Sequence, residues 1–137
     1  MVSSVATDQV NVSHVDNERY EILIRGHRVL VDQPEVAGGE NSAPTPTELF
    51  VGSLTACVAF YAGRYLSRHG FAREGLRVRA SFDMATDRPA RVASIRITVR
   101  PPAGFPPERF APLAAVASHC TVHNSIDRAP RIRVGVE

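Results

Sequence analysis

The sequence contains no tryptophan and no lysine, so all 16 of its basic residues are arginines. These arginines are interspersed with acidic and apolar residues, and the formal net charge is only +2. Nucleic-acid-binding domains usually carry a clustered basic stripe along one face. The sequence shows no such cluster, and we therefore expect no nucleic-acid partner.

Long hydrophobic runs are also lacking. The longest run without a charged residue or a histidine, at positions 49–63, has 15 residues, fewer than the roughly 20 that a membrane-spanning helix needs. The first residues have neither the charged start nor the apolar stretch of a secretory signal. We therefore expect a cytoplasmic protein with no membrane partner. A chain of 137 residues with 44% hydrophobic content is typical of one globular domain, residues 1–137.

Short segments of alternating apolar residues predict six strands. They lie at residues 10–15, 20–25, 28–32, 76–82, 92–99 and 131–136. A tight turn at Gly26 and His27 is expected to join the second strand to the third, and the fourth and fifth strands form a second hairpin. With two helices, the expected order is strands, helix, strands, helix, strand. This order predicts an α+β fold rather than an alternating βαβ fold.

The first helix begins with a clear local signal. Thr45 suits the N-cap, Pro46 the first helical position and Glu48 the third, so that Thr-x-x-Glu forms a capping box. The helix is expected to run to about Arg68 and to end near Gly70, because glycine readily adopts the left-handed conformation that terminates helices.

Two apolar stripes run along this helix, so most of its surface is expected to be buried. One stripe consists of Phe50, Leu54, Cys57 and Tyr61, and the other only of the small residues Gly52, Ala56, Ala59 and Gly63. The small-residue stripe would let another backbone approach closely. A second copy of the chain is a good candidate for that neighbour.

A second, shorter helix is predicted within residues 102–120, with Pro112 in its first turns. Cys120 is expected to close this helix, and residues 121–127 to add one further turn. The only two cysteines, Cys57 and Cys120, are thus predicted in the middle of one helix and at the end of another.

Cys57 lies in a charge-free apolar stretch, where a cysteine is most often a core residue. A free thiol has a pKa near 8.5 and is only about 3% ionised at pH 7, so reactivity would require a nearby positive charge. The helix dipole is too distant, because Cys57 is about 18 Å from the helix start. Arg64 is about 10 Å away along the same face, and an arginine from a strand would be better placed.

Cys120 adds a second interpretation. Structural disulfides are rare in a reducing compartment, and a pair of cysteines there indicates a transient catalytic bridge. Spacing alone does not show that Cys57 and Cys120 meet. The sequence is therefore compatible with both a structural role and a redox role for the two thiols.

The segment GGENSAPTPTELFVGSLTACVA is followed about 60 residues later by HCTVHNSI. Together they resemble the OsmC/Ohr family of thiol-dependent hydroperoxide reductases. The resemblance runs from about Gly26 to the C-terminus, with residues 1–15 poorly matched. It implies an OsmC-like intertwined dimer, in which antiparallel sheets wrap around two central helices. It also implies that Cys57 attacks the hydroperoxide and that Cys120 is the resolving thiol.

The same resemblance implies a homodimeric peroxidase that reduces organic hydroperoxides in oxidative stress defence. An external dithiol or lipoyl-type reductant would reopen the disulfide after each turnover. No bound cofactor and no metal are expected. The apolar surroundings of Cys57 would favour organic hydroperoxides over hydrogen peroxide.

The resemblance also implies a carboxylate and an arginine at the site, and for each of them the sequence leaves alternatives open. The best-characterised members carry a carboxylate where this chain has Thr47, so the neighbouring Glu48 is either a catalytic carboxylate or only part of the capping box. Their activating arginine comes from an N-terminal strand. Arg19 is the nearest candidate for it, and Arg25 and Arg28 are rivals.

The residue after the second cysteine is often proline in the family and is Thr121 here. The chain is thus closer to the general OsmC-like branch than to the organic hydroperoxide reductases. One alternative function is a non-catalytic OsmC-like dimer that binds a small hydrophobic ligand. Another is a purely structural dimer in which Cys57 contributes only to stability.

Overall fold

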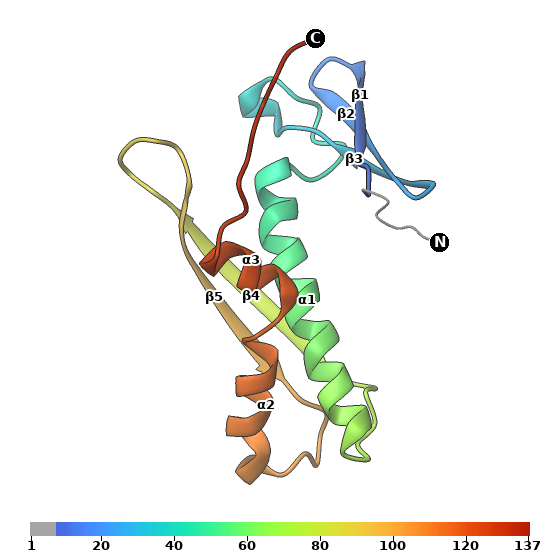
Figure 1. The fold of residues 1–137 in the computed structure, drawn as a ribbon, viewed down its shortest axis with the longest axis vertical. Coiled ribbons are helices and arrows are strands. Elements are labelled where there is room, and N and C mark those ends of the chain that lie inside the picture. Colours follow the sequence, from blue (N-terminus) through green and yellow to red (C-terminus); the bar gives the residue numbers. More distant parts are fainter. Residues whose placement is uncertain (1–7) are drawn as a thin grey trace. The chain divides into compact units, whose positions relative to one another are not determined.

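The computed structural model of the protein describes residues 8–137 (Figure 1). The chain forms two compact units, one ending at Leu49 and the other beginning at Phe50, within the first α-helix. Residues 1–7, the start of the segment expected to carry no secretory signal, lie outside the described residues.

The first unit contains a three-stranded antiparallel sheet in the order β1–β2–β3. Its strands are β1 (Asn11–Asp16), β2 (Arg19–Ile24) and β3 (His27–Val31). The turn between β2 and β3 consists of Arg25 and Gly26, whose φ angles are 48° and 81°. Two successive left-handed residues are what a two-residue hairpin of type I′ requires. The three predicted strands are therefore confirmed, but the turn lies at Arg25 and Gly26, one residue earlier than the predicted Gly26 and His27.

Asp32 organises the long loop that follows β3. It is 1% exposed, and its carboxylate accepts a hydrogen bond of 2.6 Å from the Ser42 hydroxyl and others from three backbone N–H groups of the loop. These bonds, the Ser42 hydroxyl first, lower the pKa of Asp32 to about 2. The loop includes the short 3₁₀ turn η1 (Glu35–Ala37). At Gly39 a Cβ atom would lie 2.0 Å from the carbonyl oxygen of Gln33, so only glycine fits there.

The first helix, α1 (Pro46–Arg68), has the predicted bounds. The hydroxyl of Thr45 accepts a hydrogen bond from the backbone N–H of Glu48, and the Glu48 carboxylate accepts one from the N–H of Thr45. This reciprocal pair is the predicted capping box. At the other end the chain leaves the helix through Gly70, whose φ is 78°.

The second unit consists of most of α1, an antiparallel hairpin and two short helices. The hairpin strands are β4 (Arg77–Met84) and β5 (Val92–Arg100), and their register pairs Ala80 with Ile97. A 3₁₀ turn, η2 (Pro107–Arg109), leads into α2 and α3. In Figure 1 the hairpin and α1 lie side by side, with α2 next to them.

The core of the second unit is built mainly from one side of α1. Its buried members are Leu54, Val58, Ala62, Tyr65, Leu66, Phe105, Leu113, Ala117 and Cys120, and apolar residues of the hairpin pack against them. By length and composition alone α1 could also cross a membrane, since its most apolar window has a mean hydropathy of 1.3. Core helices of soluble proteins pass the same test, and here α1 supplies the core.

The second predicted helix is divided into α2 (Phe110–Ala117) and α3 (Thr121–Asp127). Pro112 is the third residue of α2, in the first turn as expected, where its missing N–H has no intrahelical acceptor. Cys120 does not close α2, so that prediction was wrong. It is the N-cap of α3, because its sulfur accepts a hydrogen bond from the third residue of that helix.

The prediction of a C-terminal strand was also wrong for the single chain. Residues 131–136 form no strand, and Ile132 and Val134 are 78% and 91% exposed. A strand needs a neighbour to pair with its backbone groups, and none of the described strands lies beside this segment. The small-residue stripe of α1 is buried only in part: Gly63 packs against Arg73 and Leu76, whereas Gly52 is exposed.

Candidate functional site

Cys57 lies in the fourth turn of α1, on the side that faces the core. Its side chain is partly buried and packs against the core cluster of the second unit. Leu54 and Val58, its neighbours on the helix, are both buried. The thiol therefore lies at the border of the core, where it is shielded by apolar side chains but still accessible.

Cys120 is a member of the same core cluster and has no exposed surface. Its sulfur accepts a hydrogen bond from the backbone N–H of His123 at 3.4 Å, the capping contact of α3. The ring of His123 is held in turn, because its Nδ1 lies 2.6 Å from the carbonyl oxygen of Ser118. A carbonyl oxygen can only accept, so Nδ1 carries the proton.

Both predicted cysteines pack in the core of the second unit, close enough for the Cys57 thiol to affect the pKa of Cys120, and both are free thiols. Burial raises the pKa of the Cys120 thiol above its usual value, the His123 N–H opposes this, and the adjacent Cys57 thiol raises the pKa further. Cys120 is therefore a neutral thiol at pH 7 in the reduced protein. Since Cys57 is the more accessible of the two, it is the thiol that a dissolved reactant meets first.

A further contact between the two cysteine-bearing segments was not predicted from the sequence. The hydroxyl oxygens of Tyr61, on α1, and Thr121, the first residue of α3, lie 2.8 Å apart and share a hydrogen bond. Tyr61 follows Cys57 by one helical turn, and Thr121 directly follows Cys120. Their positions next to the cysteines were the available signal, but a contact between residues 60 positions apart has no local signature.

The other two predicted site residues lie in the first unit and are held there by different partners. Arg19 donates two hydrogen bonds of 2.6 Å from Nε and Nη2 to the carboxylate of Asp16. These hydrogen bonds are the main reason why the pKa of Asp16 is lowered. Glu48 is engaged in the capping box with Thr45. Within the described part of this unit, Arg19 and Glu48 form no ion pair with each other.

Two other arginines named in the sequence analysis also have partners. Arg28 forms an ion pair with Glu21 on the neighbouring strand. Arg64 places its guanidinium carbon 5.5 Å from the centre of the Phe60 ring, a cation–π contact on the same helix. Its charge is thus held above an aromatic ring one turn away rather than in an acidic cluster.

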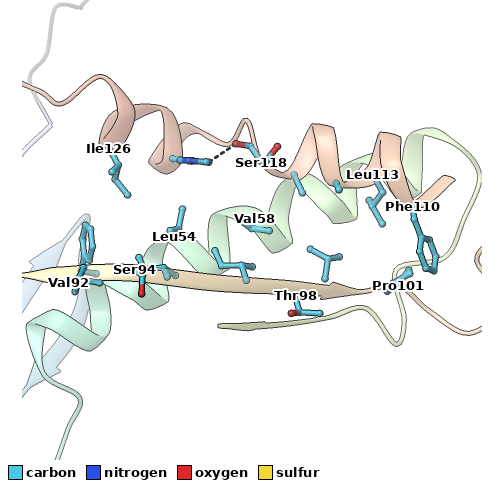
Figure 2. Close-up of a pocket in the computed structure, with 18 residues that line it drawn as sticks. Leu54, Val58, Val92, Ser94, Thr98, Pro101, Phe110, Leu113, Ser118 and Ile126 are labelled. Carbon is cyan, nitrogen blue, oxygen red and sulfur yellow. Dashed lines mark hydrogen bonds between the residues drawn. The ribbon is translucent and has the colours of Figure 1, made fainter. Parts of the chain in front are cut away.

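A groove of about 710 Å³ lies in the second unit, and neither Cys57 nor Cys120 is among the residues that line it. Figure 2 shows that residues of α1, β5, α2 and α3 line it, with Leu54, Val58 and Leu113 among them. Its lining is mostly aliphatic, with a few polar groups such as His123 and Ser118. The volume lies within the range of small-molecule sites. Among residues 8–137, no group of three or more His, Cys, Asp or Glu side chains could hold a metal ion.

Comparison with solved structures shows the same fold in several bacterial proteins. A proposed osmotic stress induced and detoxification response protein from Psychrobacter arcticus superposes with a TM-score of 0.80 at 20% identity, covering 90% of this chain and 91% of the other. The organic hydroperoxide resistance protein OsmC from Legionella pneumophila gives 0.68 at 16% identity, with 90% and 91% coverage. OhrB from Bacillus subtilis, also an organic hydroperoxide resistance protein, gives 0.64 at 13% identity, with 89% and 91% coverage.

No curated protein matches the sequence. The family model described as OsmC-like protein, however, matches residues 39–135. This stretch contains the second half of the loop before α1, both cysteines and nearly all of the second unit. The resemblance seen in the sequence is thereby confirmed, and so is the α+β fold of OsmC and Ohr proteins. The chain belongs to the OsmC-like family.

Proposed function

We propose that this protein is a thiol-dependent peroxidase that reduces organic hydroperoxides in oxidative stress defence. The observation that carries the proposal is the position of Cys57, partly exposed at the border of the core, beside the fully buried thiol of Cys120. Membership of a family that includes hydroperoxide resistance proteins supports it. The apolar surroundings of Cys57 suit an organic substrate better than hydrogen peroxide.

The proposed reaction has three steps. The Cys57 thiolate attacks the distal oxygen of ROOH; an S–O bond forms, the O–O bond breaks, and the alkoxide takes up a proton and leaves as ROH. The sulfur of Cys120 then attacks the sulfenic sulfur of Cys57; an S–S bond forms, and hydroxide leaves as water with the proton of the Cys120 thiol. An external dithiol supplies two electrons and two protons to restore both thiols.

The raised pKa of Cys120 fits its role as the second thiol to react. A neutral, buried thiol does not compete for the hydroperoxide, because the thiolate is the nucleophile and Cys120 has no exposed surface. It becomes a reactant only when a sulfenic acid forms on the adjacent Cys57. The order of the two cysteines thus follows from their burial.

Activation of Cys57 requires a positive charge, for which Arg19 is our candidate, with Glu48 as the carboxylate that orients it. Arg19 now donates to Asp16 through Nε and Nη2. This leaves Nη1 as a donor group for a further acceptor, since a guanidinium has donors on all three nitrogens. A guanidinium suits a thiolate because it stays charged at every pH at which the protein is folded.

We further propose that the protein acts as a cytoplasmic homodimer with a dithiol or lipoyl-type reductant. The exposed alternating segment at residues 131–136 supports a dimer, because its apolar residues have no partner strand among residues 8–137 of one chain. Pairing with a sheet edge of a second copy would satisfy its backbone groups and bury Ile132 and Val134. Sedimentation of the full chain and of a chain ending at residue 130 tests this.

Consumption of cumene hydroperoxide with excess dithiothreitol tests the function. The wild type is expected to turn over, and Cys57→Ser to be inactive because a hydroxyl is not ionised at pH 7. Cys120→Ser is expected to reduce one equivalent rapidly and then to stall. Each variant replaces one sulfur atom by an oxygen atom and leaves the rest of the side chain unchanged. An unchanged melting temperature would exclude unfolding as the cause of lost activity. An active Cys57→Ser variant would refute the proposal.

The groove supports a second candidate function, the non-catalytic binding of a small hydrophobic molecule. Its volume of about 710 Å³ and its aliphatic lining suit such a ligand. Leu113→Trp would fill the groove and is expected to abolish binding of an apolar fluorescent probe. This function is favoured if the wild type binds the probe but does not consume hydroperoxide.

A further inference from the structure

The hydrogen bond between Tyr61 and Thr121 connects the two segments that carry the cysteines. Tyr61 follows Cys57 by four residues, so both lie on the same face of α1, about 6 Å apart along the helix axis. Thr121 follows Cys120 directly and begins α3. The two hydroxyl oxygens are 2.8 Å apart, a distance typical of a strong O–H···O bond. This single hydrogen bond therefore restrains both segments close to their cysteines.

α3 depends on such restraints for its position. It has only seven residues, none of them fully buried, although Val122 packs against the core cluster. Helices this short are not stable alone in water. An element with few buried contacts belongs to the least stable part of a structure and opens readily. Within the segment, His123 is tied to Ser118, but that bond closes a local turn and does not reach α1.

We infer that Tyr61 and Thr121 form a positioning pair, which holds the start of α3 against α1 so that Cys120 stays within bridging range of Cys57. The inference rests on the disulfide step of the proposed function. Neither side chain reacts; both act through Cys120. When the disulfide forms, the neighbouring Thr121 stays fixed to α1.

The physical effect is preorganisation. Without the bond, the reduced chain would sample conformations in which the start of α3 lies away from α1. Closing the disulfide would then require the loss of that freedom. Loss of one neutral hydrogen bond is therefore expected to lower the effective concentration of one thiol at the other by about threefold to tenfold.

Redox equilibrium with glutathione measures this effective concentration without any peroxide. Glutathione disulfide takes up the two electrons and two protons released when Cys57 and Cys120 form their bond, and yields two molecules of glutathione. Tyr61→Phe and Thr121→Val each remove one hydroxyl and keep the shape. Each is expected to lower the effective concentration about threefold to tenfold, and the double variant no further, because both changes remove the same bond.

Two further variants separate positioning from a general loss of stability. Thr121→Ser keeps the hydroxyl and is expected to behave as the wild type. Ser125→Ala removes another hydrogen bond of 2.8 Å from α3, donated by the Ser125 hydroxyl to the Thr121 carbonyl, which does not reach α1. It is expected to leave the effective concentration unchanged.

Wild-type values for Tyr61→Phe and Thr121→Val would overturn the inference. So would multiplying effects in the double variant, or failure of the wild type to form the intramolecular disulfide at any glutathione ratio. A failure of the proposed function looks different. In that case the wild type would form the disulfide in glutathione buffer, and the variants would show the expected lower effective concentration. Cumene hydroperoxide, however, would not be consumed.

Discussion

Oxidation of the protein to the Cys57–Cys120 disulfide is expected to stabilise it substantially. The bridge would close a loop of 63 residues, and the loss of chain entropy in the unfolded state is worth about 4 kcal/mol for a loop of this length. With an unfolding entropy of about 2 cal/mol/K per residue, the melting temperature should rise by about 10–15 °C.

Calorimetry of the reduced protein and of protein oxidised with diamide measures this shift, after mass spectrometry of a tryptic digest has identified the linked peptides. Cys120→Ser, treated in the same way, is the control and should show no shift. The structure places the two thiols side by side in the core cluster of the second unit, so the bridge should form without large rearrangement. An oxidised protein that melts at or below the temperature of the reduced one, or that contains only intermolecular disulfides, would refute this reasoning.

Glu48→Gln separates the two roles of this residue: glutamine preserves a capping box, so stability should be unchanged, whereas hydroperoxide consumption should fall if the carboxylate is catalytic, and wild-type activity would assign Glu48 to the cap alone. Thr45→Ala removes the other half of the box and should cost about 1 kcal/mol in a denaturant titration, with a loss below the error of the measurement counting against the capping geometry. Asp32 has a pKa of about 2 in the folded protein, below its ordinary value of 3.8, so its contribution to stability is complete above about pH 4 and is lost as the pH falls through 2. The melting temperature of Asp32→Asn should therefore fall less than that of the wild type over this range, and parallel curves would contradict the assignment.

Local signals in the sequence were sufficient for the long helix and for the first hairpin. Thr45, Pro46 and Glu48 determine where α1 begins through interactions over three residues, and Gly70 determines where it ends. Such signals depend only on neighbouring residues. For this reason the bounds of α1, and with them the place of Cys57 in the helix, could be predicted without knowledge of the fold.

One unusual local contact, and the features that depend on distant partners, could not be predicted in this way. The break between α2 and α3 contains neither glycine nor proline; it is stabilised by the sulfur of Cys120, which most often packs as an apolar atom and here caps a helix. Residues 131–136 alternate as a strand does, but no described strand pairs with them. The burial of Asp32 and the Tyr61–Thr121 bond likewise appear only when segments distant in sequence come together.

The ionisation of Cys57 is the central requirement of the proposed peroxidase. The rate of its alkylation by iodoacetamide as a function of pH, measured in the Cys120→Ser variant so that a single thiol reacts, tests this most directly. An activated thiol should titrate roughly two to three pH units below the ordinary value of about 8.5, and Arg19→Ala should move the midpoint back toward that value. A midpoint at or above 8.5 in the protein with Arg19 intact would contradict the account.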